Sequence, residues 1–221
     1  MFLGSTFERP RIVSLPPVCD QNTNPVAVRA PNETLVLRVT CQKTGRLYPE
    51  DEWAPDYFIE QDSRRLRPPL LPQNNPYALW SPNSDLLAIG SSDGGSVGNW
   101  KVYVYSIEHG AVMTHDVMGR VQAEIARDFP AAVNPAGTEF FSQRERTEYA
   151  RDPSWVNVLA KHWLRNPERL LVTAGVPPSS SCGANMGKMR GYIIDPHSGD
   201  ILRRYTESQF RRVWPGYADS H

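Results

Sequence analysis

Short stretches of alternating apolar and polar residues dominate the chain and predict β-strands. The stretch TLVLRVTCQKTGRLY, from Thr34 to Tyr48, alternates in this way and then reaches a turn at Gly45. Its apolar face consists of Leu35, Leu37, Val39 and Cys41. Strict alternation over this length indicates a half-buried strand, and the glycine favours a turn, so the stretch predicts a hairpin.

Two further stretches have the same form. Trp100 to Val117 has apolar or aromatic residues on both faces of its first half, which is typical of a central strand covered on both sides, and it turns at His109-Gly110. Gly191 to Tyr205 turns through Asp195-Pro196-His197-Ser198-Gly199, where proline presets φ and glycine can take a left-handed conformation. Both are predicted to be hairpins.

Three segments are predicted to be helical, the first two from the spacing of their apolar residues. These are Met118 to Phe129, Asp152 to Leu164 and Thr206 to Trp214. The second opens with an aspartate cap followed by proline, and the third has the threonine-x-x-glutamine form of a capping box. Val176 to Gly191 is small and polar enough to predict a mobile loop.

One part of the chain resembles a known repeat. WSPNSDLLAI, from Trp80 to Ile89, is followed by Asp93-Gly94-Gly95 and by the hairpin that begins at Trp100. Over about residues 77–117 this order is similar to a blade of TolB-like or WD-repeat β-propellers, and a fainter copy starts at Val133 and runs to Phe141. That family implies a fold that carries enzymes and binding platforms alike, so the resemblance leaves the function open.

The chain departs from a regular propeller in its spacing. Its three predicted hairpin glycines are unevenly separated, whereas blades repeat every ~40–50 residues. We therefore expect an α+β fold, mainly antiparallel β, in which a blade-like antiparallel sheet or incomplete propeller is decorated by two or three helices. One domain is expected over residues 1–221, with a mainly β part (1–117) and a mixed α+β part (118–221) as the alternative division.

Composition narrows the classes of partner. The 221 residues carry 24 basic and 24 acidic side chains, and this balance argues against nucleic acid or an anionic membrane as the main partner. No apolar run reaches the roughly 18–20 residues of a membrane span, and no secretory signal is recognisable, which predicts a soluble protein of the cytoplasm, or of the periplasm if the N-terminus was trimmed.

The three cysteines, Cys19, Cys41 and Cys182, include no CxxC pair. This argues against a zinc site and against a full disulfide framework. A single Cys19–Cys41 bridge stays open, on the condition that the mature protein is periplasmic. Neither a cofactor nor a metal is expected.

Known catalytic and ligand-binding motifs fit poorly. GANMGK, from Gly183 to Lys188, lacks the spacing and the final serine or threonine of a P-loop. GGSVG, from Gly94 to Gly98, is predicted to lie in a hairpin loop rather than before a helix, and nothing local pairs Cys182 with a histidine base. No catalytic residue is assigned.

The histidines do not match a known metal-binding motif either. His109, His115 beside Asp116, His162 and His197 follow no metal-binding spacing, so each is expected to be a turn or surface histidine. His162 is the exception, because it lies on the apolar stripe of its predicted helix, where we expect a hydrogen-bonded, partly buried ring.

The most distinctive segment is LYPEDEWAPDYFIE, from Leu47 to Glu60, which mixes acids with aromatic residues and two prolines. Aromatic anchors surrounded by charge suit an interface with a basic partner. The predicted partner-binding residues are Tyr48, Glu50, Asp51, Glu52, Trp53, Asp56 and Tyr57. In the alternative, the aromatic residues turn into the core and the acids pair with Arg64, Arg65 and Arg67.

A second candidate surface is the arginine-rich and aromatic segment from Arg203 to Tyr217. Its favoured interpretation is a helix that packs Phe210 and Trp214 inward and leaves its arginines in water.

These observations favour a non-catalytic protein that binds another protein. The class we expect is an immunity or inhibitor protein that neutralises a partner toxin by inserting the acidic-aromatic segment into its active site. The alternative is a hydrolase with catalytic residues on the loops Asp93–Asn99 and Val176–Gly191. A structural subunit of a larger assembly is a third hypothesis, which a large apolar surface patch would indicate.

Overall fold

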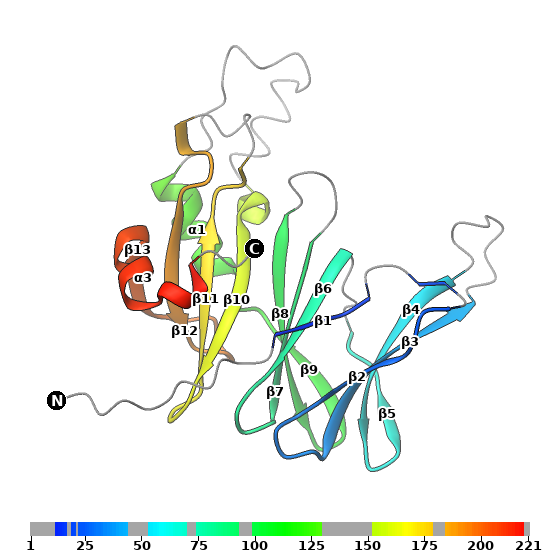
Figure 1. Ribbon diagram of the computed structural model, residues 1–221. Coiled ribbons are helices and arrows are strands. Elements are labelled where there is room, and N and C mark those ends of the chain that lie inside the picture. Colours follow the sequence, from blue (N-terminus) through cyan, green and yellow to red (C-terminus); the bar gives the residue numbers. More distant parts are fainter. Residues whose placement is uncertain are drawn as a thin grey trace.

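Three antiparallel β-sheets stand side by side in the protein (Figure 1). The computed structural model describes residues 12–16, 19–20, 22–43, 53–69, 74–92, 99–129, 152–178 and 184–218. Each sheet contains four strands that are consecutive in the chain and adjacent in space, and the middle sheet has one added edge strand. Neighbouring strands are therefore joined by local connections.

The strands divide among the sheets in chain order. The N-terminal sheet has the order β2-β3-β4-β5, with β2 Val26–Arg29, β3 Leu35–Lys43, β4 Trp53–Gln61 and β5 Arg64–Leu66. The middle sheet has the order β1-β6-β7-β8-β9, with β1 Val13–Ser14, β6 Asn74–Trp80, β7 Leu86–Ser92, β8 Trp100–Glu108 and β9 Ala111–His115. The C-terminal sheet has the order β10-β11-β12-β13, with β10 Asn157–Leu164, β11 Arg169–Gly175, β12 Met189–Ile194 and β13 Ile201–Thr206.

The described helices are short and belong to the C-terminal half. They are α1 Gly119–Asp128 and α3 Glu207–Val213, with single 3₁₀ turns η3 Pro153–Trp155 and η5 Pro215–Tyr217. This mainly antiparallel architecture with two α-helices in the described residues confirms the α+β expectation.

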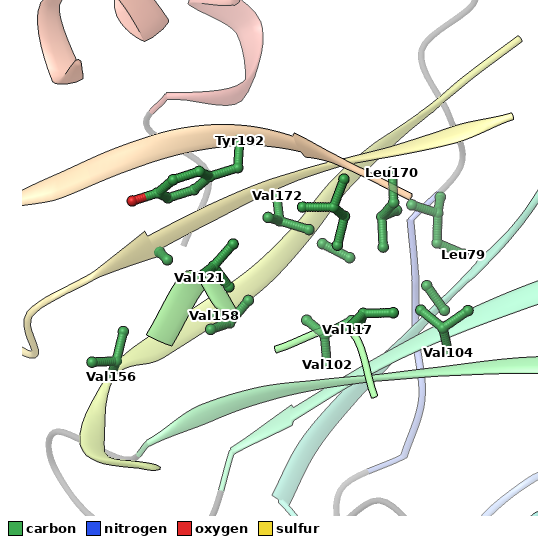
Figure 2. Packing of buried hydrophobic residues seen from close by; sticks show 14 of the residues in the cluster. Leu79, Val102, Val104, Val117, Val121, Val156, Val158, Leu170, Val172 and Tyr192 are labelled. Carbon is green, nitrogen blue, oxygen red and sulfur yellow. The ribbon is translucent and has the colours of Figure 1, made fainter. Parts of the chain in front are cut away.

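The middle sheet buries both of its faces. In β7, Leu86 and Ala88 point into a core shared with β10, β11 and β12, whereas Leu87 and Ile89 point into a second core shared with β2, β3 and β4. Side chains alternate between the two faces of a strand, so a run that is apolar at every position can serve two cores at once. Figure 2 shows the first core, where Leu79, Val102 and Val104 face Leu170 and Val172.

Buried polar atoms join the sheets. The Tyr77 hydroxyl of β6 accepts a hydrogen bond from the Ala160 backbone N–H (2.9 Å) and donates one to the Ala160 carbonyl (3.2 Å). The hydroxyl therefore provides hydrogen-bond partners for both backbone groups of Ala160 in the edge strand β10. The Trp163 indole N–H donates to the Leu79 carbonyl, and the Trp80 indole N–H donates to the Val28 carbonyl, each at 2.9 Å. Because unpaired buried groups are costly, these bonds fix how each sheet sits on the middle one.

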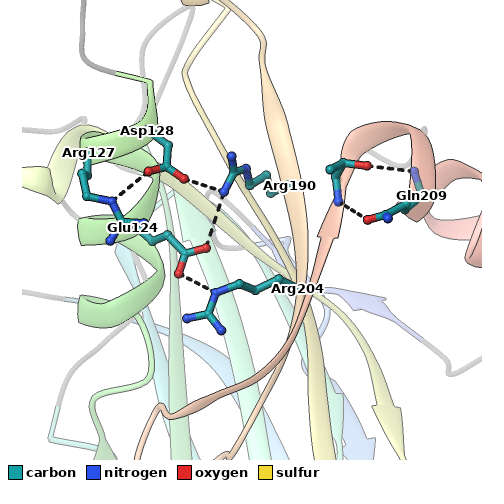
Figure 3. A network of polar contacts seen from close by, with 7 residues as sticks. Glu124, Arg127, Asp128, Arg190, Arg204 and Gln209 are labelled. Atoms are coloured by element: carbon teal, nitrogen blue, oxygen red, sulfur yellow. Dashed lines mark hydrogen bonds and ion pairs between the residues drawn. The ribbon is translucent and has the colours of Figure 1, made fainter.

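The α1 helix is held from both sides. Val121 and Ile125 enter the first core, while Glu124 accepts a hydrogen bond from Arg204 of β13 at 2.7 Å. Arg190 of β12 bonds Asp128 at the end of the helix (Figure 3). The same view shows the predicted capping box of α3, in which Thr206 and Gln209 exchange side-chain and backbone hydrogen bonds.

Two of the three predicted hairpins are confirmed. β8 and β9 meet at Glu108↔Ala111, with His109 (φ 52°) and Gly110 (φ 77°) forming the tight turn. β12 and β13 flank the predicted turn, in which Gly199 has φ 69°. The remaining stretch does form strand β3, but its partner is β4, and the expected turn at Gly45 lies outside the described residues.

The predicted helix from Asp152 to Leu164 is wrong. The aspartate cap exists, because Asp152 accepts a hydrogen bond from the Ser154 N–H, yet the helical part ends at Trp155 and strand β10 follows. A β-bulge between Ala160 and His162 interrupts the strict alternation of β10. The inserted residue leaves Val158, Ala160 and Trp163 in one core at uneven spacing, so the segment lacks the alternating pattern of a strand.

The segment that resembles a propeller blade forms the consecutive strands β6 to β9. The other two sheets are also four-stranded meanders, although only this segment carries the sequence pattern. The fainter copy from Val133 to Phe141 lies outside the described residues, and so does part of the loop predicted over Val176 to Gly191. The end of that loop differs from the prediction, because Met189, Arg190 and Gly191 belong to strand β12. That strands β6 to β9 form a blade of a propeller stays a prediction.

Gly191→Ala tests the packing of α3 on the C-terminal sheet. A Cβ at Gly191 would lie 1.9 Å from the Phe210 ring, which is fully buried, so we expect the free energy of unfolding to fall by roughly 3 kcal/mol. Urea denaturation followed by circular dichroism measures this change. Gly119→Ala is the control, because a Cβ there meets only the Asp116 side chain at 3.3 Å, and its effect should stay below about 1 kcal/mol. An equal effect of both substitutions would contradict the packing described.

Candidate functional site

The longest hairpin of the N-terminal sheet carries part of the predicted binding segment. β3 and β4 pair without interruption from Leu35↔Gln61 to Lys43↔Trp53. A disulfide joins Cys19 to Cys41, which stands opposite Pro55 close to the end of the hairpin where residues 44–52 connect the two strands. The bridge that the sequence left open is therefore present, and it ties this end of β3 to the chain that precedes β2.

Trp53 occupies the last pair of the hairpin. Its side chain is partly exposed, and the Lys43 ammonium lies 5.6 Å from the centre of its ring. A cation near an aromatic face is attracted by the ring electrons, which favours one placement of the indole. Trp53 is thus an accessible aromatic group on a fixed strand.

Asp56 and Tyr57 are placed differently from the surface residues expected. Tyr57 is 1% exposed within the core between the N-terminal and middle sheets, and burial raises its pKa to about 12. Asp56 is 5% exposed and accepts hydrogen bonds from both terminal nitrogens of Arg67. These two residues follow the alternative in which the aromatic ring turns inward and the acid pairs with an arginine.

The remaining predicted contacts cannot be placed. Tyr48, Glu50, Asp51 and Glu52 lie in the chain that links Lys43 to Trp53, outside the described residues. Of the seven predicted partner-binding residues, the structure brings Trp53, Asp56 and Tyr57 onto one strand, β4. Only Trp53 of these three presents an appreciably exposed side chain.

The outer face of the N-terminal sheet is lined with arginines. Arg38 pairs with Glu60, and the Arg65 guanidinium lies 4.4 Å from the centre of the Phe58 ring. At the other end of the molecule, Phe210 is buried while Arg211 and Arg212 are exposed, which agrees with the favoured interpretation of the second candidate surface.

A pocket that the sequence did not indicate lies between the middle and C-terminal sheets. It has a volume of about 370 Å³. Strands β1, β6 and β8 and the chain next to them form one side, and β10 forms the other. Its lining residues are Ile12, Ser14, Leu15, Asn75, Pro76, Tyr77, Trp100, Leu159, Ala160 and Lys161.

Lys161 is the lysine among the residues that line this pocket. It stands at the β-bulge of β10, is 4% exposed, and has its pKa lowered to about 8 by burial, which disfavours the charged ammonium. The helix predicted over this segment gives Lys161 no special position. The available signal was a lysine within the apolar run from Val158 to Leu164, which a strand would bury.

The histidines do not form a metal site in the described residues. His115 and His197 come together in a T-shaped contact with ring centres 5.0 Å apart, and burial lowers the pKa of His115, with a smaller effect from His197. No group of three or more histidine, cysteine or acidic side chains suited to a metal occurs in the part of the chain that the structure describes. His109 is a turn residue, as expected.

A pair of carboxyl groups lies at the turns between strands. The Glu168 carboxylate accepts a hydrogen bond from the Asn83 backbone N–H at 2.8 Å, and burial, followed by the proximity of Asp85, raises the Glu168 pKa. Asp85 in turn accepts a hydrogen bond from Ser81 at 3.0 Å. These contacts fix the β6–β7 turn against the β10–β11 turn, which gives the pair a structural role.

The loops of the hydrolase alternative are only partly described. Residues 93–98 and 179–183, including Cys182, lie outside the described chain. Among the described helices, none combines the length and the apolar character needed to cross a bilayer.

Comparisons with models of protein families, with curated proteins and with solved structures found no match.

His162 predicts an acid-dependent loss of stability. Its ring stacks on Tyr217 at 5.3 Å between ring centres, and burial, together with Arg165, lowers its pKa from 6.5 to about 4. The unfolded chain binds this proton more readily, so the stabilisation is present above pH 6.5 and is lost as the pH falls towards 4. After allowing for partial solvation of the ring, the free energy of unfolding should fall by about 1–2 kcal/mol over this pH range.

Urea denaturation of the wild type and of His162→Leu at pH values from 7 to 4 measures this loss. The leucine variant should show a shallower fall in the free energy of unfolding over this range. Identical pH profiles for the two proteins would show that His162 does not titrate as described.

Proposed function

We propose that the protein is a non-catalytic binding protein of the immunity or inhibitor class, which neutralises a partner toxin by occluding its active site. The partner contacts the connected end of the β3–β4 hairpin, at Lys43 and Trp53. The observation that carries the proposal is the combination, at this end, of an accessible tryptophan with a disulfide that holds the strand beside it.

Preorganisation is the physical reason for placing the contact there. Binding to a flexible loop is weakened by the entropic cost of ordering that loop. A strand that is already fixed by the hydrogen bonds of the sheet and by a disulfide avoids this cost. Trp53 supplies a large aromatic surface, and tryptophan is enriched among the residues that dominate binding energy. The described position of Trp53 therefore suits an anchor in a pocket of the partner.

The acidic residues complete the proposed interface. Glu50, Asp51 and Glu52 precede Trp53 directly in the chain, so any contact made by Trp53 brings them within reach of the same partner. Acidic side chains around an aromatic anchor accelerate encounter with a basic surface. Asp56 and Tyr57 are assigned a supporting role, because one is paired with Arg67 and the other packs in the core.

The Cys19–Cys41 disulfide favours an oxidising compartment for this function. Structural disulfides persist in the periplasm and outside the cell, and they are rare in the cytoplasm. We therefore propose the periplasm rather than the cytoplasm as the place where the partner is met.

Trp53→Ala tests the proposal directly. We expect it to weaken binding to the cognate toxin about 30-fold or more, because it removes the central aromatic contact. Toxins encoded beside the gene provide the candidates. Protection of sensitive cells by coexpression and isothermal titration calorimetry with the purified toxin measure the effect.

Two variants control this experiment. Trp53→Phe keeps an aromatic ring and should keep most of the affinity, whereas Val213→Ala changes an exposed residue on α3, far from the hairpin in the sheet order, and should bind like the wild type. Tyr57 is unsuitable as a test, because its removal would open the core. If Trp53→Ala binds and protects like the wild type, or if no neighbouring toxin is neutralised by the wild type, the proposal is wrong.

A further inference from the structure

Strand β9 ends the middle sheet and is paired on one side. Its partner is β8, from Val104↔His115 to Glu108↔Ala111, and the pairing has no register shift. A strand at the edge of a sheet presents a row of backbone N–H and C=O groups that can pair with a strand of another chain. The edge of β9 is therefore a candidate interaction surface.

The hairpin turn decides which backbone groups of β9 face outward. A two-residue turn, here His109-Gly110, is closed by a hydrogen-bonded pair, and pairs with and without hydrogen bonds then alternate along the ladder. The first, third and fifth residues of β9 thus bond β8, whereas the N–H and C=O groups of Val112 and Thr114 point away from it. No backbone hydrogen bond from another described residue reaches these outward groups.

The other edge strands of the described sheets carry features that oppose pairing with a further strand. Charged side chains, short length and bulges all protect a sheet edge. β1 has two residues, β13 contains a register shift, and β10 has Ala160 bonded by Tyr77 of the middle sheet. Strands β2, β5 and β13 carry arginines, which are Arg29, Arg64, Arg65, Arg203 and Arg204.

β9 has none of these features. Its sequence, AVMTH, contains no acid, lysine or arginine, and burial lowers the pKa of His115, which favours the neutral ring. Met113, at the centre of the strand, is 53% exposed, whereas Val112 packs against the core between the N-terminal and middle sheets. The strand is thus held by the fold while its central apolar side chain remains in water.

We propose that β9 pairs antiparallel with β9 of a second copy of this chain, which joins the two middle sheets into one continuous sheet across a two-fold axis. Met113 then faces Met113 of the second copy. In this register Val112 of each chain exchanges two backbone hydrogen bonds with Thr114 of the other, which satisfies the outward groups of both strands.

Self-complementarity is the reason for choosing a second copy as the partner. The register sets Ala111 opposite His115 of the second copy, so no like charges meet within the strands. It brings Asp116, the acid that follows β9, beside Gly110 of the second copy rather than beside another acid. The two methionines form a pair without hydrogen bonds, in which side chains lie closest, so each covers the other.

The interface is small, because β9 has five residues in each chain. Stable dimers bury more surface than such a ladder provides, so we expect a dissociation constant of about 10–100 µM. At lower concentrations the chain is a monomer, and β9 behaves as an ordinary edge strand. This surface lies on the middle sheet, apart from Trp53 on the N-terminal sheet, and the inference does not depend on the proposed function.

Sedimentation velocity of the full chain between about 1 and 300 µM tests the pairing. The mass of the wild type should rise from one chain to two and stop there, because a two-fold interface is closed. Met113→Lys should weaken the dimer about tenfold or more, because it sets two ammonium groups opposite each other. Met113→Glu should do the same with two carboxylates.

An equimolar mixture of Met113→Lys and Met113→Glu gives the sharpest result. Lysine then faces glutamate across the axis, so the mixture should form a mixed dimer at concentrations where each variant alone is a monomer. Leu202→Lys is the matched control, because Leu202 is 50% exposed on the edge strand β13, and this variant should dimerise like the wild type. Circular dichroism checks that each variant is folded.

Five outcomes would overturn the proposal. The wild type stays a monomer over the whole range, or it associates beyond two chains. Met113→Lys dimerises like the wild type, or Leu202→Lys loses the dimer to the same extent. The mixture of the two Met113 variants stays monomeric.

Discussion

The fold depends on the need to cover both faces of the middle sheet. Strand β7 is buried at every position, with Leu86 and Ala88 on one side and Leu87 and Ile89 on the other. A sheet of this kind is unstable alone, because either exposed face would place a row of apolar side chains in water. The N-terminal and C-terminal sheets supply the two covers, so the three meanders form one stacked unit. The indole and phenol bonds from Trp80, Trp163 and Tyr77 then set the position of each cover.

Both candidate sites follow from this arrangement. The N-terminal sheet packs on the middle one through Leu37, Val39 and Tyr57, which leaves the far end of the β3–β4 hairpin free to carry Trp53 beyond the core. The C-terminal sheet meets the middle one along the edge strand β10. The pocket lined by Leu159, Ala160 and Lys161 lies where these two sheets meet, beside the bulge at Ala160 and His162. The site at Trp53 therefore lies outside the packed surfaces of the sheets, and the pocket lies between the middle and C-terminal sheets.

The sequence predicted the parts whose signals are local. The alternation from Leu35 to Cys41, the turn at His109-Gly110 and the capping box from Thr206 to Gln209 each depend on a few neighbouring residues, and each is present in the structure. The spacing of apolar residues predicts a helix where strand β10 forms, because a bulge is a feature of strand pairing that the spacing within one strand does not reveal. For a related reason the sequence leaves Tyr57 open between a partner contact and the core, and it gives Lys161 no special position. Burial in this protein comes from contacts between sheets, and no pattern within a single strand shows which sheet will cover it.

Amide hydrogen exchange of the native protein tests the central claim, that the middle sheet is the layer on which both cores depend. If this is so, the amides of Leu87, Ala88 and Ile89 in β7 open only when the whole protein unfolds, and their exchange free energies equal the global free energy of unfolding. The edge strands β5 and β9 should exchange faster through local opening. Exchange in β7 as fast as in those edge strands would contradict the account, because it would show that the middle sheet opens without disrupting the two cores.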